Sequence, residues 1–402
     1  MVMGADHNYF NDVWTGIYGD DWDAYVDSAD PTCGQSPATS IRLTAAEQQR
    51  VGVAYTAGFF RLTLGKESAF LPMFQSGSGS SVQVGAATVL QATQSPASQR
   101  LDVAPLQASA SNVQFSGAVN GQYCASIGGV SSQSGLPSCS DSTYTSRFPS
   151  FTPPTHTPNV PASPMLHLQW TGAGTVTAAL PRYDVSRYGA LTVRAALDGV
   201  STAADLTLTV VDGAGRGQSS TVSALSDALT SLPGNQDVLP KTWLRTVRWP
   251  VSQLTKVNTR NIRQIRITTP AAASGVLLSD LAFSNAAVGT GAPTTLPQLS
   301  VTSTTAAENA GQATVTVALS KASAVPVTVH LQALSGGTQI TAAAQQVVIP
   351  AGQTSAAVRV PVVENAVVDA TADTRYEVVL GYPTNAVTGQ NTAYITVHDD
   401  ES

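Results

Sequence analysis

His7 is the first residue of the chain whose type suits catalysis, and it stands in the short polar segment Gly4-Ala5-Asp6-His7-Asn8. The unperturbed pKa of histidine is about 6.5, so its imidazole can accept a proton from a nucleophile and return it near neutral pH. A serine nucleophile on a strand-turn-helix elbow needs a Gly-x-Ser-x-Gly segment, and the chain has none. The alternative is that His7 is an ordinary turn residue. In either case we expect the chain to be catalytically silent by itself.

Two of the three cysteines, Cys124 and Cys139, bracket a Gly/Ser-rich loop, where a disulfide would restrain an otherwise loose segment. Cys33 is left over, which in a secreted protein indicates a partner elsewhere. The alternative for Cys33 is a buried free thiol, because cysteine is among the most buried residue types. The Cys124–Cys139 disulfide predicts an oxidising compartment and hence a secreted, extracellular protein.

The composition excludes some classes of partner. Charged residues make up 11% of the 402 residues, against about 25% in an average soluble protein. The net charge is −6 and the lysines and arginines are scattered, so no binding to nucleic acid is expected. No apolar run reaches the roughly 18 residues that span a bilayer, so no membrane span is expected.

Local signals predict one long helix followed by strands. The helix runs from about Ala45 to Leu64, because Thr44 and Glu47 form a capping box and Gly65 stands where a C-terminal cap belongs. After Ser76, short alternating segments between Gly, Ser and Pro turns predict strands, about seven of them after Leu299. The predicted domains are 1–75, the helical part; 76–165, a β-rich extension with a Pro-rich strap; 166–285, a first β-sandwich; 286–297, a linker; and 298–402, a second β-sandwich.

The segment from Gly4 to Phe10 resembles the loop after the last strand of α/β-hydrolases, and the resemblance extends through the helix to about Phe74. In that family the nucleophile and the acid precede the histidine in the chain. The resemblance implies that His7 is the catalytic histidine and that the missing N-terminal part of the catalytic domain is a partner. The implied reaction is ester or amide hydrolysis through an acyl-enzyme, which requires no cofactor.

The segment from about Leu299 to Ser402 resembles a Calx-beta domain, through Glu308-Asn309-Ala310-Gly311, Ile349-Pro350-Ala351-Gly352 and Asp399-Asp400-Glu401. Some members of that family bind calcium through carboxylates at one end of the sandwich, and calcium takes about six to eight oxygen ligands. The resemblance implies a calcium site formed by Glu308, Glu364, Asp369, Asp399 and Asp400. A carboxylate position common in the family is replaced by residues 341–344, which contain none, so we expect weak binding.

The segment from Leu166 to Phe283 resembles a galactose-binding-like jelly roll, with the closing run from Val276 to Phe283. Relatives often bind polysaccharide by stacking sugars on exposed aromatic rings. The rings available here are Trp170, Tyr183, Tyr188, Trp243 and Trp249. The alternative is that these rings belong to the core, as aromatic residues in strands usually do.

The expected fold class is therefore mainly β: an α/β-hydrolase remnant with one long helix, a jelly-roll-like sandwich and an immunoglobulin-like Calx-beta sandwich. We interpret the chain as the C-terminal part of a secreted serine-type α/β-hydrolase with accessory binding modules. The alternative is a non-catalytic extracellular protein that binds a polysaccharide or a cell-surface ligand, in which both sandwiches do the binding.

Overall fold

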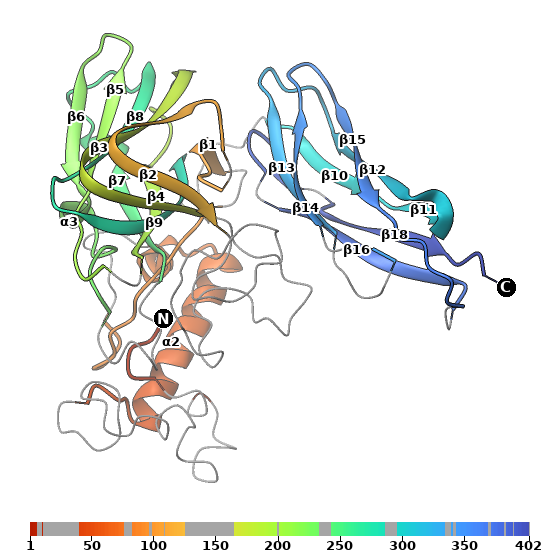
Figure 1. Ribbon diagram of the computed structural model, residues 1–402. Helices are drawn as coiled ribbons and strands as arrows, with labels where there is room; N and C mark the ends of the chain where they lie inside the picture. The colour runs from red at the N-terminus through yellow and green to blue at the C-terminus, as the bar shows by residue number, and fades with distance from the viewer. Residues whose placement is uncertain are drawn as a thin grey trace.

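The computed structural model describes residues 1–5, 10, 40–75, 83–95, 99–107, 109–124, 165–198, 201–232, 243–285, 296–333, 339–340, 343–368, 371–381, 383–388 and 390–401. Within these ranges the chain forms a helical N-terminal unit followed by two β-sandwiches (Figure 1). The expected mainly-β fold class is confirmed. No helix among the described residues is long and apolar enough to cross a membrane.

The predicted helix is present as α2 (Ala45–Thr63), and its capping box is formed as predicted. The Thr44 hydroxyl accepts a hydrogen bond from the Glu47 backbone N–H at 3.3 Å, and the Glu47 carboxylate accepts one from the Thr44 N–H at 2.9 Å. The C-terminal end differs, because the left-handed residue is Lys66, with a φ of 58°, rather than Gly65. A Cβ on Gly65 would lie 2.6 Å from the Arg61 carbonyl oxygen. Close backbone approach, not a positive φ, therefore requires this glycine.

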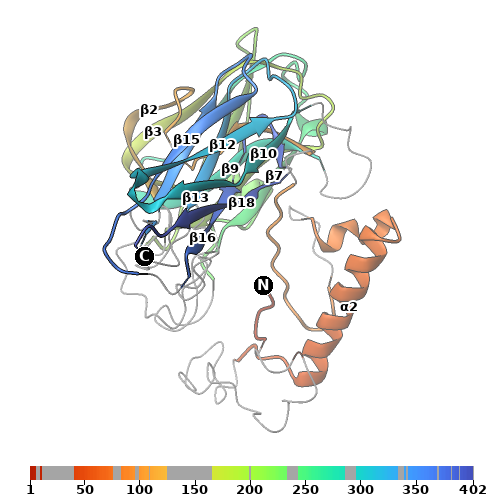
Figure 2. The same cartoon turned by 90° about the vertical axis from the view of Figure 1, so that its right-hand side faces the viewer.

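One face of α2 packs against the short 3-10 helix η2 (Ser68–Met73). Gly58 makes the close approach possible, since a Cβ there would lie 2.8 Å from the Met73 sulfur. Figure 2 shows that α2 lies outside both sandwiches. The extended residues 91–95 connect this unit to the middle sandwich: Thr93 exchanges hydrogen bonds with the Thr246 hydroxyl at 2.7 and 2.8 Å.

Nine strands form the sheet of the middle sandwich, and this sheet curls around one core. They are β1 (Arg100–Ala104), β2 (Val113–Cys124), β3 (Met165–Tyr183), β4 (Ala190–Leu197), β5 (Thr207–Asp212), β6 (Gly217–Thr221), β7 (Arg245–Pro250), β8 (Ile262–Thr269) and β9 (Ser274–Ser284). Two short helices, α3 (Val222–Leu225) and η4 (Val251–Gln253), connect strands of this sheet. The pairing of β1 with β9 and of β2 with β3 shows that the sheet includes residues N-terminal to 166.

The long strand β3 belongs to both halves of the curled sheet. Its residues Leu166–Trp170 pair with β9, whereas residues from Gly174 to Tyr183 pair with β8. One half therefore runs in the order β2-β3-β8-β5-β6 and the other in the order β3-β9-β4-β7. The inward-facing residues of the two halves form the core, in which Leu168, Ile265 and Phe283 are fully buried.

The C-terminal sandwich consists of two sheets around a separate core. One sheet contains β10 (Gln298–Thr302), β12 (Gln312–Leu319), β15 (Ser355–Pro361) and β17 (Val387–Thr388). The other contains β11 (Thr304–Ala307), β13 (Val327–Ala333), β14 (Ala343–Ile349), β16 (Asp373–Gly381) and β18 (Thr392–His398). The strands predicted from the alternation are present, and the short β11 and β17 are additional.

Candidate metal site

A parallel strand pair brings the acidic residues of the C-terminal sandwich together. β11 and β18 run parallel, with Ala307 opposite His398. Parallel strands leave a sheet at the same edge, so the residues that follow them become neighbours. Glu308 follows β11 and opens the 3-10 turn η5 (Glu308–Ala310), and Asp399 to Glu401 follow β18. Strand pairing thus makes neighbours of residues that are more than 90 positions apart in the sequence.

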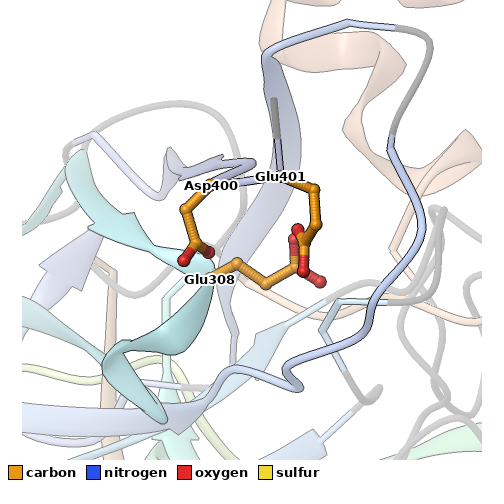
Figure 3. A group of neighbouring side chains, drawn as sticks. All are labelled: Glu308, Asp400 and Glu401. Atoms are coloured by element: carbon orange, nitrogen blue, oxygen red, sulfur yellow. The ribbon is translucent and has the colours of Figure 1, made fainter.

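Three carboxylates converge at this end of the sandwich. One carboxylate oxygen from each of Glu308, Asp400 and Glu401 lies within 4.8 Å of the other two (Figure 3). Asp400 is held by the neighbouring turn, because the Asn309 side-chain amide donates to its Oδ2 at 2.6 Å. The arrangement is therefore built from the turn after β11 and the segment after β18.

Glu308 is fully buried, and amide groups hold its carboxylate in place. Gln339 Nε2 donates to Oε2 at 3.0 Å, and the Asn365 backbone N–H donates to Oε1 at 3.0 Å, with the Asn365 side-chain amide donating to the same atom. Among the described residues no lysine, arginine or histidine forms an ion pair with Glu308. A buried carboxylate without a cation is costly, so its charge needs a counter-ion.

A second layer of hydrogen bonds fixes Gln339. The Tyr376 hydroxyl donates to Gln339 Oε1 at 3.0 Å and accepts from the Gln339 backbone N–H at 3.3 Å. Tyr376 lies on β16 and is 2% exposed. Because both ends of the Gln339 side chain are bonded, its amide nitrogen is directed at Glu308. The Glu308 carboxylate is therefore oriented before any ion binds.

The crowding of carboxylates raises pKa values at this end of the sandwich. The hydrogen bond with the Asp399 side chain, with burial and the charges of Asp400 and Glu308, raises the pKa of Glu401 to about 7. Burial raises the pKa of Glu364, and the charges of Asp400 and Glu308 raise it further. Glu401 Oε2 is buried and has no hydrogen-bond partner in the described part of the chain. The charges of Asp400 and Glu308 thus add to a larger cause in each group, the hydrogen bond with Asp399 for Glu401 and burial for Glu364.

The structure brings together most of the residues predicted for this site and adds one. Glu308 and Asp400 are in the cluster, Glu364 is close enough to sense their charges, and Asp399 accepts a hydrogen bond from the Glu401 N–H at 3.3 Å. Asp369 lies outside the described residues. Glu401 was missed, although it completes the acidic run Asp399-Asp400-Glu401 that the sequence analysis singled out.

The donor atoms of this cluster suit one class of ion. Carboxylate oxygens are hard ligands, which calcium prefers, whereas zinc selects nitrogen and sulfur. Glu308 Oε1 uses both lone pairs to accept from Asn365, whereas Oε2 accepts one hydrogen bond from Gln339 and keeps a lone pair for an ion. With Asp400 and Glu401 opposite, the residues fit a calcium ion.

Two further predicted sites are only partly described. His7 lies outside the described residues, so its catalytic role stays a prediction. Cys124 is fully buried and disulfide-bonded. The two other cysteines of the chain, Cys33 and Cys139, both lie outside the described residues, so the pairing with Cys139 also stays a prediction.

The aromatic rings suggested for sugar stacking do not form an exposed platform. Trp170 and Trp249 are 3% and 2% exposed and belong to the core of the middle sandwich. Tyr183 and Tyr188 pack against the same core. Trp243 lines a pocket of about 420 Å³ beside α2 instead of the sheet face. The core alternative was therefore the correct interpretation of the strand tryptophans.

No family model and no curated protein matches the chain. The apo form of the Calx CBD1 domain matches 26% of this chain and 99% of its own length, with 18% identity and a TM-score of 0.25. The family 11 carbohydrate-binding module from Clostridium thermocellum, in complex with a β-1,3-1,4-mixed-linked tetrasaccharide, matches 48% of this chain and 97% of its own length, with 12% identity and a TM-score of 0.28. An exo-β-agarase matches 46% of this chain and 24% of its own length, with 14% identity and a TM-score of 0.27. At these TM-scores none of the likenesses supports a statement about function, so the candidate site rests on its own geometry.

Proposed function

We propose that the chain is a non-catalytic, secreted binding protein whose C-terminal sandwich holds a calcium ion between Glu308, Asp400 and Glu401. The observation that carries this proposal is the buried Glu308 carboxylate, which faces two further carboxylates and pairs with no cationic side chain in the described part of the chain. A bound divalent cation neutralises this charge and supplies the missing partner of Glu401 Oε2.

The geometry favours calcium over magnesium. Magnesium demands near-ideal octahedral ligands and keeps several waters, so it is usually held by one or two carboxylates. Here three carboxylates converge and two more, Glu364 and Asp399, lie beside them. Calcium accepts this crowded and irregular set of oxygens, including bidentate carboxylates.

The ion would act as a cross-link between distant parts of the chain. Glu308 belongs to the turn after β11, whereas Asp400 and Glu401 belong to the segment after β18. Binding to the folded state alone stabilises that state by mass action, by about 1.4 kcal/mol at a calcium concentration ten times the Kd. For an extracellular site the expected Kd is about 10⁻⁴ to 10⁻³ M.

Glu308→Gln tests the proposal, because it keeps the size of the side chain while removing the charge; its oxygen can still accept from Asn365, but its amide N–H₂ then faces the Gln339 Nε2 donor. We expect calorimetric titration to show calcium binding to the natural chain and none to the variant. In the calcium-free state the loss of the Gln339 hydrogen bond opposes the gain from removing a buried charge, so calcium binding and not stability is the readout. Glu377→Gln, on β16 in the same sandwich, is the matched control and should bind calcium normally. Equal binding by all three proteins would refute the proposed site.

The interpretation as part of an α/β-hydrolase is a separate proposal for residues 1–75. It rests on the sequence resemblance around His7 alone, because a capped helix such as α2 occurs in many folds. It predicts no esterase activity of this chain, because histidine has no nucleophile to activate. Turnover of a p-nitrophenyl ester that His7→Ala abolishes would contradict this prediction.

A further inference from the structure

One face of the middle sandwich is exposed and is rich in hydroxyl side chains. In the half-sheet β2-β3-β8-β5-β6, alternate residues such as Val176, Ile267 and Leu208 are buried in the core. Successive side chains of a strand point to opposite faces, so their neighbours lie on the solvent side. These strands are hydrogen-bonded neighbours in this order, and Figure 1 shows β5 and β6 at the left of the middle sandwich.

The strand register aligns hydroxyl side chains across this face. The first row contains, from β2 to β6, Ser116, Thr175, Thr268, Thr207 and Thr221. The second row, two residues along each strand, contains Gln114, Thr177, Arg266, Thr209 and Ser219. We call these ten residues the hydroxyl face. With strands about 4.8 Å apart, each row extends roughly 19 Å, and the rows lie about 6.7 Å from each other.

Several of these hydroxyls have unused hydrogen-bonding capacity. Among the hydrogen bonds of the described residues, none involves the hydroxyls of Thr175, Thr177, Thr207 or Thr268. These four side chains are half-exposed and adjacent to one another on β3, β8 and β5. Each hydroxyl can donate one hydrogen bond and accept two. The centre of the hydroxyl face therefore presents donors and acceptors together.

The hydroxyl face carries little charge, and this excludes metal cations and polyanions as its ligands. Arg266 is the one charged residue among the ten, and its guanidinium is bonded to the Gln264 side-chain oxygen at 2.8 and 3.1 Å. No carboxylate on the face offers a cation site, and a single guanidinium does not attract a polyanion. An apolar partner would strip water from the hydroxyls without replacing their hydrogen bonds.

Strand propensity does not account for this pattern by itself. Threonine is favoured on any exposed strand, but serine and glutamine are not. One of the ten residues is charged, close to the 11% of the whole chain, so the low charge follows the composition and the alignment of hydroxyls is the distinguishing feature. An extended row of uncharged donors and acceptors matches a polymer that repeats uncharged hydroxyl groups.

We propose that the hydroxyl face binds a neutral polysaccharide laid across the strands β2, β3, β8, β5 and β6. The site differs from the aromatic platform expected from the sequence, because hydrogen bonds replace ring stacking. The inference specifies the ligand of the proposed binding protein and does not use the calcium site, so either proposal can fail without the other.

Two assays test the inference. Affinity electrophoresis runs the full chain through gels that contain a soluble β-1,3-1,4-glucan or a galactomannan, and sedimentation measures its binding to microcrystalline cellulose. The variant is the triple substitution Thr175→Val, Thr207→Val and Thr268→Val, which removes hydroxyls and keeps the β-branched shape. We expect retention by at least one of the three polysaccharides, weakened about tenfold or more in the variant.

The matched control is Thr302→Val, Thr314→Val and Thr316→Val, on exposed positions of the C-terminal sandwich. It should bind as the natural chain does, and thermal unfolding followed by circular dichroism, which reports on both sandwiches, should show that both triple variants are folded. No retention by any of the three polysaccharides overturns the proposal, as does equal weakening in both triple variants. Retention only by the polyanions alginate or dextran sulfate overturns it as well.

Discussion

Asp280 connects the extended residues before β1 to the sheet of the middle sandwich, and its replacement should destabilise that sandwich strongly. Its Oδ1 accepts hydrogen bonds from the side chains of Gln94 at 2.7 Å and Gln107 at 3.2 Å. Its Oδ2 accepts the Arg194 Nε–H at 2.6 Å. The carboxylate is 6% exposed, and the residue has a left-handed φ of 58°. The ion pair with Arg194, the two glutamine hydrogen bonds and the left-handed backbone conformation therefore all depend on Asp280.

Two substitutions separate these contributions. Asp280→Asn keeps an acceptor for the two glutamines and tolerates the left-handed backbone, but it places an amide N–H₂ against Arg194. Removing one partner of a buried ion pair costs about 3–5 kcal/mol; because Arg194 is 22% exposed, we expect about 3 kcal/mol. Asp280→Ala also loses both glutamine bonds, at about 1 kcal/mol each, and adds about 1–2 kcal/mol of backbone strain, for a total of about 6–7 kcal/mol.

Urea unfolding followed by tryptophan fluorescence measures the effect, because Trp170 and Trp249 are buried in the middle core and residues 298–402 contain no tryptophan. The matched control is Asp373→Asn, whose partner is His398 at 3.0 Å on an exposed surface; its unfolding is followed by circular dichroism, because its sandwich has no tryptophan, and it should change stability by less than about 0.5 kcal/mol. If Asp280→Asn were as mild as this control, the contact with Arg194 would contribute nothing. Equal effects of asparagine and alanine would show that neither the glutamine hydrogen bonds nor the backbone conformation contributes to stability.

Three other predictions concern the C-terminal sandwich and the disulfide. Because the pKa of Glu401 is raised from 4.5 to about 7, the calcium-free folded state binds this proton more tightly than the unfolded chain does. Its contribution to stability should be fully present below pH 4.5 and lost as the pH rises through about 7, and a series of unfolding midpoints should show no such loss in Glu401→Gln. A fragment of residues 296–402 should melt cooperatively, since its core is its own, and its midpoint should rise at millimolar calcium; a non-cooperative melt would refute the boundary. Peptide mapping should find Cys124 bonded to Cys139, and a bond to Cys33 would contradict the assignment.

Local signals in the sequence were sufficient for the elements that local contacts stabilise. The helix α2 begins where Thr44 and Glu47 cap each other, and this contact spans three residues. The strands of the C-terminal sandwich were predictable because one side of each is buried, which produces strict alternation. β2 was not predicted, because most of its residues are exposed and it carries Gly117 and Gly121. Pairing with β3 stabilises such a strand, and this long-range contact leaves no local pattern in the sequence.

The candidate site was only partly predictable for the same reason. The resemblance identified Glu308 and Asp400, but the parallel pairing of β11 and β18 decides which carboxylates meet. β11 is four residues long, too short for its alternation to be read from the sequence. Gln339 and Tyr376, which orient Glu308, carry no charge and belong to no motif, so only their position in the folded chain shows their role.

The two sandwiches place their polar chemistry at different positions, and this makes the two proposed activities separable. The carboxylates of the C-terminal sandwich lie beyond the ends of β11 and β18, because like charges directly opposite each other within a ladder are destabilising. Uncharged hydroxyls carry no such penalty, so they can occupy successive positions across the faces of β3, β8 and β5. The two sites share no residue and belong to separate cores. Because the two sandwiches have separate cores, combining Glu308→Gln with the Thr175, Thr207 and Thr268 substitutions should change the unfolding free energy of each sandwich by the same amount as in the separate variants, within about 0.5 kcal/mol. A larger deviation, measured by urea unfolding of the single and combined variants, would show that calcium binding and the hydroxyl face are coupled through the chain.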